Sequence, residues 1–329
     1  MRNIVFHQVG ALGDLFVCFK ALYALKMLFK DDKLILFTKG YDKEFLRGLS
    51  FIDECYFYED FEELKKLKAD IFISEQPSNR FAKYLKKFKI KKIILHPSFV
   101  SFFSFKLTCP FPYLKFRYRV SDRLLKLIYL VDKKHFRKNI KNVDFSKLKN
   151  CLPLDEVQSL EFFAELKGFK KIVGINAFSF TCERKGDNFS HRQWFELAEK
   201  LSKRYKNFCF VLLNYKYNCL QYNINQSENL KVFVNNGGIA SLTSFQKRLD
   251  YLISIDTSNV HLCDILQVPS FVFMPLRAYK AYQNATYGGG LLYHSFVVPI
   301  AWQIFYKYFM TKFEKELNKK LSILEKIKA

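Results

Sequence analysis

Two stretches of the chain open with the same pattern and decide its fold. The first is Asn3–His7 (Asn-Ile-Val-Phe-His), which is soon followed by residues 10–14 (Gly-Ala-Leu-Gly-Asp). The second is Lys171–Asn176 (Lys-Ile-Val-Gly-Ile-Asn), which is followed by a polar loop. A short apolar run that ends at turn-forming residues is typical of a buried strand. We therefore predict that each stretch is the first strand of its own sheet.

Apolar runs alternate with amphipathic runs outward from both stretches. Further strands are predicted at 34–37, 55–58, 71–74, 92–95, 208–213, 251–255 and 270–274, and helices at 15–29, 61–68, 80–88, 121–131, 154–167, 194–205, 239–248 and 259–266. Strands that alternate with helices indicate a parallel sheet covered on both faces. The predicted fold class is α/β, with two Rossmann-like doubly wound domains that face an interdomain cleft, where the carboxyl ends of the strands bind ligands.

The length of 329 residues also favours two domains. We place the N-terminal domain at 1–153, the C-terminal domain at 154–300 and an amphipathic C-terminal helix at 301–329. Residues 133–153 are polar and basic and end at Pro153, so they are predicted to be the linker. The alternation is lost between residues 97 and 119.

The chain is strongly basic, with 54 Lys or Arg residues against 31 Asp or Glu residues and a formal net charge of +23. Half of the residues are hydrophobic, which excludes a disordered chain. Residues 83–141 hold 17 of the basic residues and two acidic ones, so they contribute 17 − 2 = +15. A surplus of this size favours anionic partners: phosphates, nucleic acid or an anionic lipid surface.

Aromatic side chains are interleaved with this basic segment between residues 99 and 118. The cations among or beside them include Lys106, Lys115, Arg117, Arg119 and Arg123. Aromatic rings next to cations are suited to a membrane interface that carries anionic lipid. For any single residue the simpler alternative is a solvated basic face over packed aromatic rings. For the whole segment we predict a surface that contacts a membrane or an anionic acceptor.

The cysteine pattern indicates the compartment. The eight cysteines are scattered and none stands in a C-x-x-C spacing, which argues against a zinc ribbon or a dithiol redox site. We interpret them as reduced thiols of a cytoplasmic protein. Asp14 interrupts the apolar stretch near the N-terminus, so no signal peptide is expected.

The first candidate for chemistry is the glycine turn at residues 10–14. Gly10 and Gly13 permit a tight turn and close approach of the backbone to a ligand, and the following helix adds a positive dipole. The turn is not G-x-G-x-x-G and lacks the Lys of a P-loop. Asp14 has two interpretations: an ordinary N-cap of the helix, or a carboxylate at the edge of the sheet that accepts a proton from a hydroxyl group.

The second candidate is residues 254–261 (Ser-Ile-Asp-Thr-Ser-Asn-Val-His), again where a strand meets a helix. Asp256 or Thr257 can cap this helix, which leaves backbone N–H groups and Ser258 to bind a phosphate. His261 lies one turn into the helix, where packing and function are about equally expected.

A third candidate is the polar loop after the strand Lys171–Asn176. In it, Arg184 and Lys185 are placed to meet a diphosphate. No D-x-D sequence occurs in the chain, so paired carboxylates for a divalent cation are not evident, and we predict no metal site and no bound cofactor.

Three blocks of the sequence, in this order and spacing, resemble the family-9 glycosyltransferases, the bacterial heptosyltransferases that build the lipopolysaccharide inner core. They are residues 9–14 (Val-Gly-Ala-Leu-Gly-Asp), residues 194–198 (Trp-Phe-Glu-Leu-Ala), and Asp256-Thr257 with His261-Leu262, followed by Pro269. The resemblance covers most of the chain. It implies a GT-B fold in which the C-terminal domain holds most of the donor nucleotide.

The resemblance also implies a reaction. The expected activity is inverting, metal-independent transfer from ADP-L-glycero-β-D-manno-heptose or a similar donor, with Asp14 as the general base. By the same analogy the donor phosphates and sugar meet Asp256, Thr257 and His261, and we add Gly13 and Ser258 to this set. The implied acceptor is an anionic glycolipid of the lipid A–Kdo type, met by the N-terminal half at the inner face of the cytoplasmic membrane. No specific nucleic-acid partner is expected.

The chain departs from the family pattern near its donor motifs. Ser258 stands where the family has Gly, and Cys263 and Asp264 stand where it has two small residues. Phe189 and Ser190 replace the Trp-Pro pair, and the expected Lys position holds Asp187, so Arg184 or Lys185 would have to substitute.

Three alternatives remain open. The enzyme can transfer another sugar, such as a hexose or an N-acetylhexosamine, for a surface glycan. A glycosyltransferase-like chain can also have lost activity and act as a binding module. Finally, a basic protein can bind nucleic acid or an anionic membrane without catalysis, although the chain matches no RRM, KH or helix-turn-helix pattern.

Overall fold

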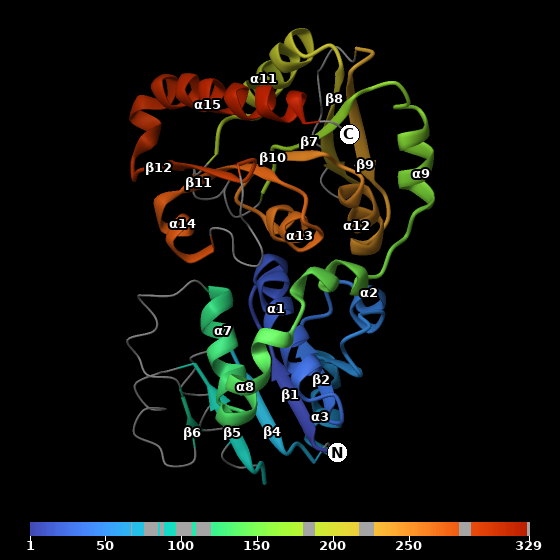
Figure 1. Cartoon of the computed structure of the whole chain (residues 1–329), viewed down its shortest axis with the longest axis vertical. Helices are drawn as coiled ribbons and strands as arrows, with labels where there is room; N and C mark the ends of the chain where they lie inside the picture. The colour runs from blue at the N-terminus through green and yellow to red at the C-terminus, as the bar shows by residue number, and fades with distance from the viewer. Residues whose placement is uncertain are drawn as a thin grey trace. The chain divides into compact units, whose positions relative to one another are not determined.

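The computed structural model describes residues 1–66, 68–75, 85, 89–96, 107–109, 120–179, 188–216, 227–282 and 291–327. The chain divides into two compact units, unit 1 (Met1–Pro153) and unit 2 (Leu154–Ala329), and each has its own sheet and core (Figure 1). Most of the helix predicted at 80–88, and most of the irregular segment at 97–119, lie outside the described residues.

Unit 1 is built on a parallel sheet in the order β3-β2-β1-β4-β5-β6. Its strands are β1 (Asn3–His7), β2 (Lys33–Thr38), β3 (Glu54–Phe57), β4 (Ile71–Ser74), β5 (Lys92–Leu95) and β6 (Leu107–Thr108). Its helical segments are α1 (Leu12–Leu28), α2 (Lys43–Arg47), η1 (Tyr58–Asp60), α3 (Phe61–Lys66), α7 (Val120–Tyr129), α8 (Lys133–Asn139), η2 (Ile140–Asn142) and η3 (Phe145–Cys151).

Unit 2 repeats this architecture with a parallel sheet in the order β12-β11-β10-β7-β8-β9. Its strands are β7 (Lys171–Asn176), β8 (Phe208–Tyr215), β9 (Leu230–Asn235), β10 (Tyr251–Ile255), β11 (Ser270–Pro275) and β12 (His294–Val298). Its helical segments are α9 (Val157–Ala164), α11 (His191–Arg204), α12 (Ile239–Lys247), α13 (Ser258–Leu266), α14 (Leu276–Tyr282), η5 (Trp302–Phe305) and α15 (Tyr306–Lys326).

The two sheets have the same topology when the strands of each unit are numbered from its first strand. Both then run 3-2-1-4-5-6, and the direction of winding reverses between the first and fourth strands. These switch points lie between β1 and β4 in unit 1 and between β7 and β10 in unit 2. Ligands of doubly wound sheets bind beyond the carboxyl ends of the strands at this position. The predicted fold class, two Rossmann-like doubly wound domains, is confirmed.

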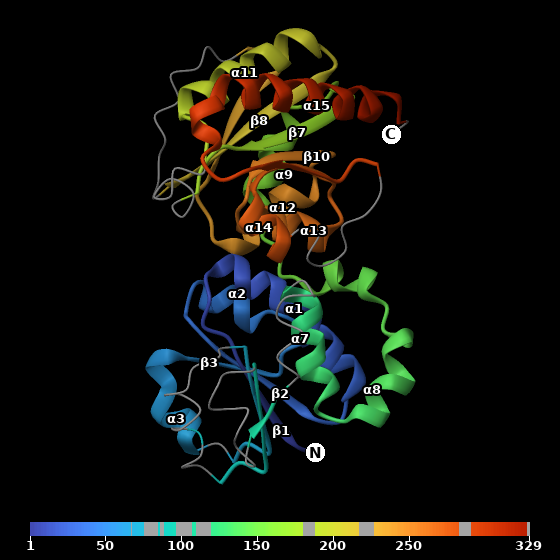
Figure 2. The ribbon, with the colours of Figure 1, turned by 90° about the vertical axis from the view of Figure 1, so that its left-hand side faces the viewer.

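The cores of both units are rich in aromatic side chains. α1 is apolar around most of its circumference, and Phe16 and Phe19 on it are almost completely buried. In unit 2, α11 and α15 lie side by side over one face of the sheet (Figures 1 and 2). Trp194 of α11 packs against Phe313 of α15, with 5.7 Å between the ring centroids.

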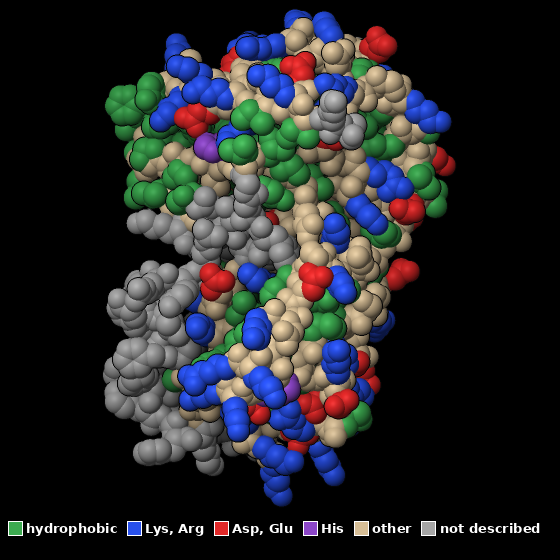
Figure 3. Space-filling model, viewed as in Figure 1, with side chains coloured by type: hydrophobic (Ala, Val, Ile, Leu, Met, Phe, Trp, Pro, Cys, Tyr) green, Lys and Arg blue, Asp and Glu red, His purple; other side chains and the backbone are tan. Residues whose placement is uncertain are grey.

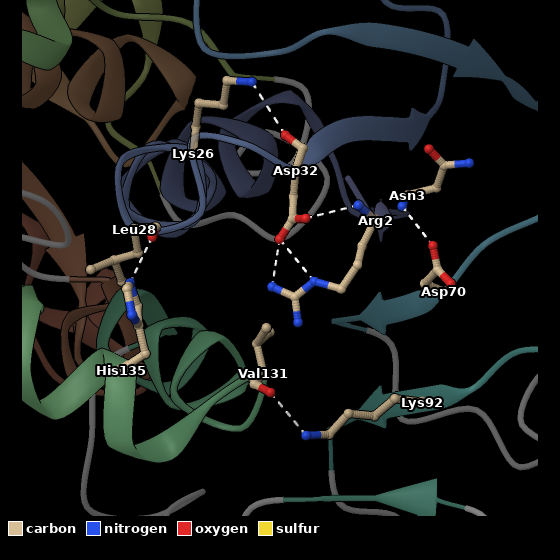
Figure 4. A network of polar contacts seen from close by, with 9 residues as sticks. All are labelled: Arg2, Asn3, Lys26, Leu28, Asp32, Asp70, Lys92, Val131 and His135. Atoms are coloured by element: carbon tan, nitrogen blue, oxygen red, sulfur yellow. Dashed lines mark hydrogen bonds and ion pairs between the residues drawn. The ribbon is translucent and has the colours of Figure 1, made fainter.

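Ionic and polar contacts join the amino ends of the unit 1 strands (Figure 4). The Arg2 guanidinium, next to β1, donates from Nε to Asp32, next to β2, at 2.9 Å. Lys92, the first residue of β5, donates from Nζ to the carbonyl oxygen of Val131 at 3.0 Å. These contacts stabilise the edge of the sheet opposite to the carboxyl ends of the strands.

The structure corrects the linker predicted at 133–153. These residues form α8, η2 and η3 and belong to unit 1. Asp132 caps α8 by accepting a hydrogen bond from the backbone N–H of His135 at 2.9 Å, and Leu148 anchors η3 in the core. The polar composition suggested a linker because few of these side chains are buried.

The C-terminal helix begins later than predicted. A 3-10 turn over Trp302–Phe305 precedes it, and α15 begins at Tyr306 rather than at residue 301. Ala301 has a φ of 62°, a left-handed conformation that does not continue into a helix. No described helix is long and apolar enough to cross a membrane.

Candidate functional site

The glycine turn of unit 1 follows β1 at the switch point. Helix α1 begins at Leu12 with Ala11 as its N-cap, so Gly13 and Asp14 lie in its first turn. Asp14 is therefore not the N-cap residue but the third residue of the helix, from which its carboxylate still caps the N–H group of the N-cap. Its carboxylate Oδ2 accepts a hydrogen bond from the backbone N–H of Ala11 at 2.8 Å, and the side chain is partly exposed.

Glu75, which directly follows β4 on the other side of the switch point, holds this turn in place. Its Oε1 accepts hydrogen bonds from the backbone N–H groups of Val9, at 3.0 Å, and Gly10, at 3.2 Å. Its Oε2 accepts a hydrogen bond from the Cys18 thiol at 3.4 Å. Burial raises the pKa of Glu75, and the negative charge of Asp14 adds to this increase.

Close packing explains why position 10 is a glycine. A Cβ atom at Gly10 would lie 2.5 Å from the Cβ and Oδ2 atoms of Asp14, which is closer than such atoms approach. The Tyr41 hydroxyl also donates a hydrogen bond to the carbonyl oxygen of Gly10. The side chains of Glu75, Asp14 and Tyr41 thus all accept from or donate to the backbone of this turn and hold it in place.

The contacts of Glu75 show what this turn is suited to bind. Backbone N–H groups of a glycine turn are the usual donors to a phosphate. Here Glu75 accepts from two of them, and a second carboxylate, Asp14, lies beside it. The site is therefore acidic, which disfavours a phosphate and suits acceptance of a proton.

The corresponding position in unit 2, where the carboxyl ends of β7 and β10 meet at the switch point, is the second candidate site; we call each such position a corner of its unit. Thr257 is the N-cap of α13, and its Oγ1 accepts a hydrogen bond from the backbone N–H of Asn259 at 3.2 Å. Asp256 precedes the cap and Ser258 is the first residue of the helix; all three are partly exposed. The start of a nine-residue helix presents N–H groups and a positive dipole to an anion.

A chain of amide and phenol side chains supports this helix start from beneath. Asn176, the last residue of β7, donates to Thr257 Oγ1 at 3.2 Å and accepts from the Tyr215 hydroxyl at 3.3 Å. That hydroxyl accepts a hydrogen bond from Asn259 Nδ2 at 2.6 Å. Gln246 of α12 donates to Asn259 Oδ1 at 2.6 Å. Burial raises the pKa of Tyr215, which keeps the phenol neutral in this chain.

The other candidate residues of α13 are buried. His261, Cys263 and Asp264 are each at most 6% exposed. The Cys263 thiol donates to Gln246 Oε1 at 3.4 Å. Two of the departures from the family-9 pattern, Cys263 and Asp264, are thus accommodated in the interior of the domain. Ser258 is the departure that lies at the helix start.

Several predicted site residues lie outside the part of the chain that the structure describes. They are Arg184, Lys185, Lys106, Lys115, Arg117 and Arg119. Arg123 is described; it lies on α7 and is partly buried. Among the described residues, no group of three or more His, Cys, Asp or Glu side chains is arranged to hold a metal ion.

The sequence did not indicate several residues of these corners. Glu75, Asn176 and Tyr215 belong to none of the candidate motifs, and Asn259, which lies within the motif at 254–261, was given no role. Arg277 was also missed: it lies on α14 directly after β11, is exposed, and so provides a cation at the carboxyl edge of the unit 2 sheet. The sequence signal that could have found these residues is the presence of polar side chains at or just after the ends of predicted strands.

No protein-family model and no curated protein matches the chain. Solved structures do match its fold. A family 9 glycosyl transferase from Veillonella parvula is 14% identical over 98% of this chain and 97% of that chain, with a TM-score of 0.70. The ADP-heptose lipopolysaccharide heptosyltransferase II of Escherichia coli is 12% identical over 99% of this chain and 100% of that chain, with a TM-score of 0.69.

A third match is the E. coli heptosyltransferase WaaC, solved with ADP-2-deoxy-2-fluoro heptose. It is 10% identical over 89% of this chain and 92% of that chain, with a TM-score of 0.58. The chain therefore has the GT-B fold of family 9 glycosyltransferases, and the resemblance inferred from the sequence is confirmed at the level of the fold.

Proposed function

We propose that this protein is a glycosyltransferase that inverts the anomeric centre and transfers a sugar from a nucleotide donor without a metal ion. Our preferred donor is ADP-heptose, and our preferred acceptor is a lipopolysaccharide or lipooligosaccharide core. The proposal combines the fold with the opposite character of the two switch-point corners. The corner of unit 1 holds two carboxylates and suits a group that accepts a proton. The corner of unit 2 is the start of a helix and suits the binding of an anion.

The donor is assigned to unit 2. Its diphosphate meets the start of α13, where Thr257 and Ser258 lie, and Asp256 contacts the donor nearby. His261, the fourth residue of α13 and 6% exposed, is assigned to the same donor site. Arg184 or Lys185 supplies positive charge to the diphosphate, as the family resemblance suggests, and Arg277 is a further candidate.

The chemical step is assigned to Asp14. As an acceptor hydroxyl oxygen attacks the anomeric carbon, its proton moves to the Asp14 carboxylate and the bond from that carbon to the diphosphate oxygen breaks. The nucleoside diphosphate departs with the electron pair of that bond. The positive end of α13 and the cations named above stabilise the departing charge. Attack opposite to the leaving group inverts the configuration.

The contacts of Glu75 are the observation that supports assigning the donor to unit 2 and the base to unit 1. Because that carboxylate accepts from the N–H groups of Val9 and Gly10, the glycine turn does not offer them to the donor diphosphate. Gly13, which we predicted for the donor set, is assigned to the shape of this turn instead. The acceptor is an anionic glycolipid, and the basic segment with Lys106, Lys115, Arg117, Arg119 and Arg123 meets it at the inner face of the cytoplasmic membrane.

Two measurements test this function. Thermal shift with ADP, UDP and GDP should show stabilisation by ADP, and transfer should require an ADP-linked sugar; binding confined to UDP or GDP would replace heptose with another sugar.

Asp14→Asn should lower the transfer rate by about 10²–10⁴-fold while ADP still binds. The matched control is Asp42→Asn, which removes an N-cap carboxylate of α2 that accepts from Phe45 N at 3.0 Å and should leave turnover unchanged. A near-normal rate for Asp14→Asn would contradict the assignment.

A further inference from the structure

Four large apolar side chains are exposed together where unit 2 passes from its last strand into its last helix. They are Ile300, Ile304, Phe305 and Tyr308, and each is between 61% and 89% exposed. In Figure 3, hydrophobic side chains gather at the edge of unit 2 where α15 begins. Contiguous apolar surface of this kind is typical of a site that contacts a partner or a membrane.

The fold holds these side chains at the surface. Trp302, which lies between them in the sequence, is 3% exposed and packs against Phe189 and Phe273, with centroid distances of 5.3 and 4.9 Å. The left-handed Ala301 turns the chain sharply just before it. The segment is thus anchored by a buried indole, and its exposed residues are a fixed feature of unit 2.

A stripe of lysines continues from this apolar patch along α15. Lys312, Lys315 and Lys319 follow Tyr308 at spacings of four, seven and eleven residues, which place them on the same exposed face of the helix. The acidic residues Glu314 and Glu316 lie beside these lysines, but each is paired with a basic side chain of another element. Glu314 is paired with Lys200 at 3.3 Å and Glu316 with His294 at 3.0 Å.

The surface beside the stripe is open and basic. A groove of about 720 Å³ lies between Arg204, at the end of α11, and the part of α15 that carries Lys315, Lys319 and Lys326; Glu314 is the one acidic side chain that lines it, so the lining keeps an excess of positive charge. Positive charge in an open groove next to an apolar patch suits phosphate groups that lie above an acyl layer.

We propose that this face of unit 2 docks on a membrane surface that carries anionic lipid. The four apolar side chains enter the boundary between head groups and acyl chains, and the lysine stripe contacts the lipid phosphates. Two-fold pairing with a second copy through the same face would bring the two lysine stripes together, which like-charge repulsion opposes. A nucleic acid would contact the lysines but would leave Ile300 and Ile304 exposed.

This contact is separate from the basic segment of unit 1 and does not depend on which sugar is transferred. The test is flotation of the full chain with vesicles of phosphatidylcholine, with or without phosphatidylglycerol. The wild-type protein should float with the anionic vesicles. Ile304→Ser combined with Phe305→Ser should weaken that binding by about tenfold or more. Lys312→Glu combined with Lys315→Glu should weaken it to a similar degree and should reduce its salt dependence.

Matched pairs in unit 2 serve as controls. Val157→Ser with Leu160→Ser removes two exposed apolar side chains from α9, and Lys167→Glu with Lys247→Glu makes the same charge change at exposed positions elsewhere. Both should bind vesicles like the wild type, and thermal melting should show that all variants fold. Patch variants that float like the wild type, or a wild type that does not float, would overturn the proposal. So would a dimer that the patch substitutions dissociate, because the occupant would then be a second copy.

Discussion

Glu75 shows how one side chain outside any motif can hold the turn that carries a candidate base. It accepts from the N–H groups of Val9 and Gly10 and so sets the path of the turn that leads to Asp14. A base must lie within hydrogen-bond reach of the proton that it removes, and misplacement by about 1 Å can lower a rate by about 10²-fold. We therefore treat Glu75 as a positioning residue for Asp14.

Glu75→Ala should lower kcat by about 10–100-fold and leave ADP affinity unchanged, because it releases the turn in unit 1 without altering unit 2. Glu75→Gln keeps an oxygen that accepts from both N–H groups and should restore most of kcat. Steady-state kinetics with calorimetric ADP binding would check this. Glu44→Ala, at an exposed position on α2, is the control and should behave like the wild type. Equal losses in the Ala and Gln variants would show that the charge, not the position of the turn, matters.

The residue types at the two corners could be recognised from the sequence, but their partners could not. Thr257 was one of two predicted caps and is the N-cap that the structure shows. Asp14 was open between a cap and a base, and the structure places it within the first turn of α1. Glu75 is 65 residues from Gly10, and the two meet only because β1 and β4 are neighbours in the sheet. Local patterns do not encode that neighbourhood.

At the scale of elements, the position of α13 depends on the hydrogen-bonded side chains beneath it, which include Asn176 and Tyr215. Tyr215→Phe removes the hydroxyl that accepts from Asn259 and donates to Asn176. Removing the hydroxyl partner of Asn176 Oδ1 and of Asn259 Nδ2 should cost about 1–3 kcal/mol of unfolding free energy. Because α13 then shifts, we also expect ADP affinity to fall roughly tenfold, since a lost charge-assisted hydrogen bond has about this effect. Urea denaturation and calorimetry would measure the two effects.

The control is the same substitution at Tyr205, whose hydroxyl donates to Asn318 Oδ1 of α15 at 3.1 Å. Tyr205→Phe should cost about 1 kcal/mol and should leave ADP affinity unchanged. If both variants weakened ADP binding equally, the effect would reflect general destabilisation of unit 2 and not the position of α13.

Strand β1 carries a buried histidine that makes folding stability depend on pH. His7 lies among Phe37, Phe72 and Tyr58, and its Nδ1 is 3.0 Å from Ser74 Oγ. Burial lowers the pKa of His7 to about 3. The unfolded chain, with a histidine pKa of 6.5, therefore binds the proton first as pH falls. The stability that comes from keeping His7 neutral is therefore complete above pH 6.5 and is lost progressively as pH falls from 6.5 toward 3.

Between about pH 8 and about pH 5 this single group should lower the free energy of unfolding by about 2 kcal/mol. His7→Asn keeps a polar atom near Ser74 but cannot titrate, so its stability should lack this component. Urea denaturation of both proteins over this range would measure the difference. Parallel curves for the wild type and His7→Asn would contradict the prediction.

Most elements with strong periodicity could be predicted, and the weak ones could not. β1, β4, β5, β7 and β10 have the predicted bounds. β6 is two residues long, which is too short to show any period. β9 was missed because Leu230–Asn235 does not alternate strictly, and β12 was missed because its five residues lie in a long uncharged stretch without a clear helix before them. Short edge strands carry little pattern of their own.

At the scale of the whole molecule, each unit has a complete sheet and core. A chain of about 150 residues buries enough surface to fold alone. We therefore expect a fragment of residues 154–329 to fold cooperatively and to bind ADP with an affinity close to that of the full chain. Residues 1–153 should fold but should not bind ADP. Circular dichroism melting and calorimetry on both fragments would check this, and ADP binding that requires both fragments would contradict the assignment of the donor to unit 2.

The shared strand order has a consequence for substitutions. Each candidate site is supported by contacts within its own unit: Glu75 and Tyr41 in one, Asn176 and Tyr215 in the other. A substitution that retunes one corner is therefore insulated from the scaffold of the other. If the donor binds unit 2 as we propose, substitutions that change its specificity leave the contacts around Asp14 in place.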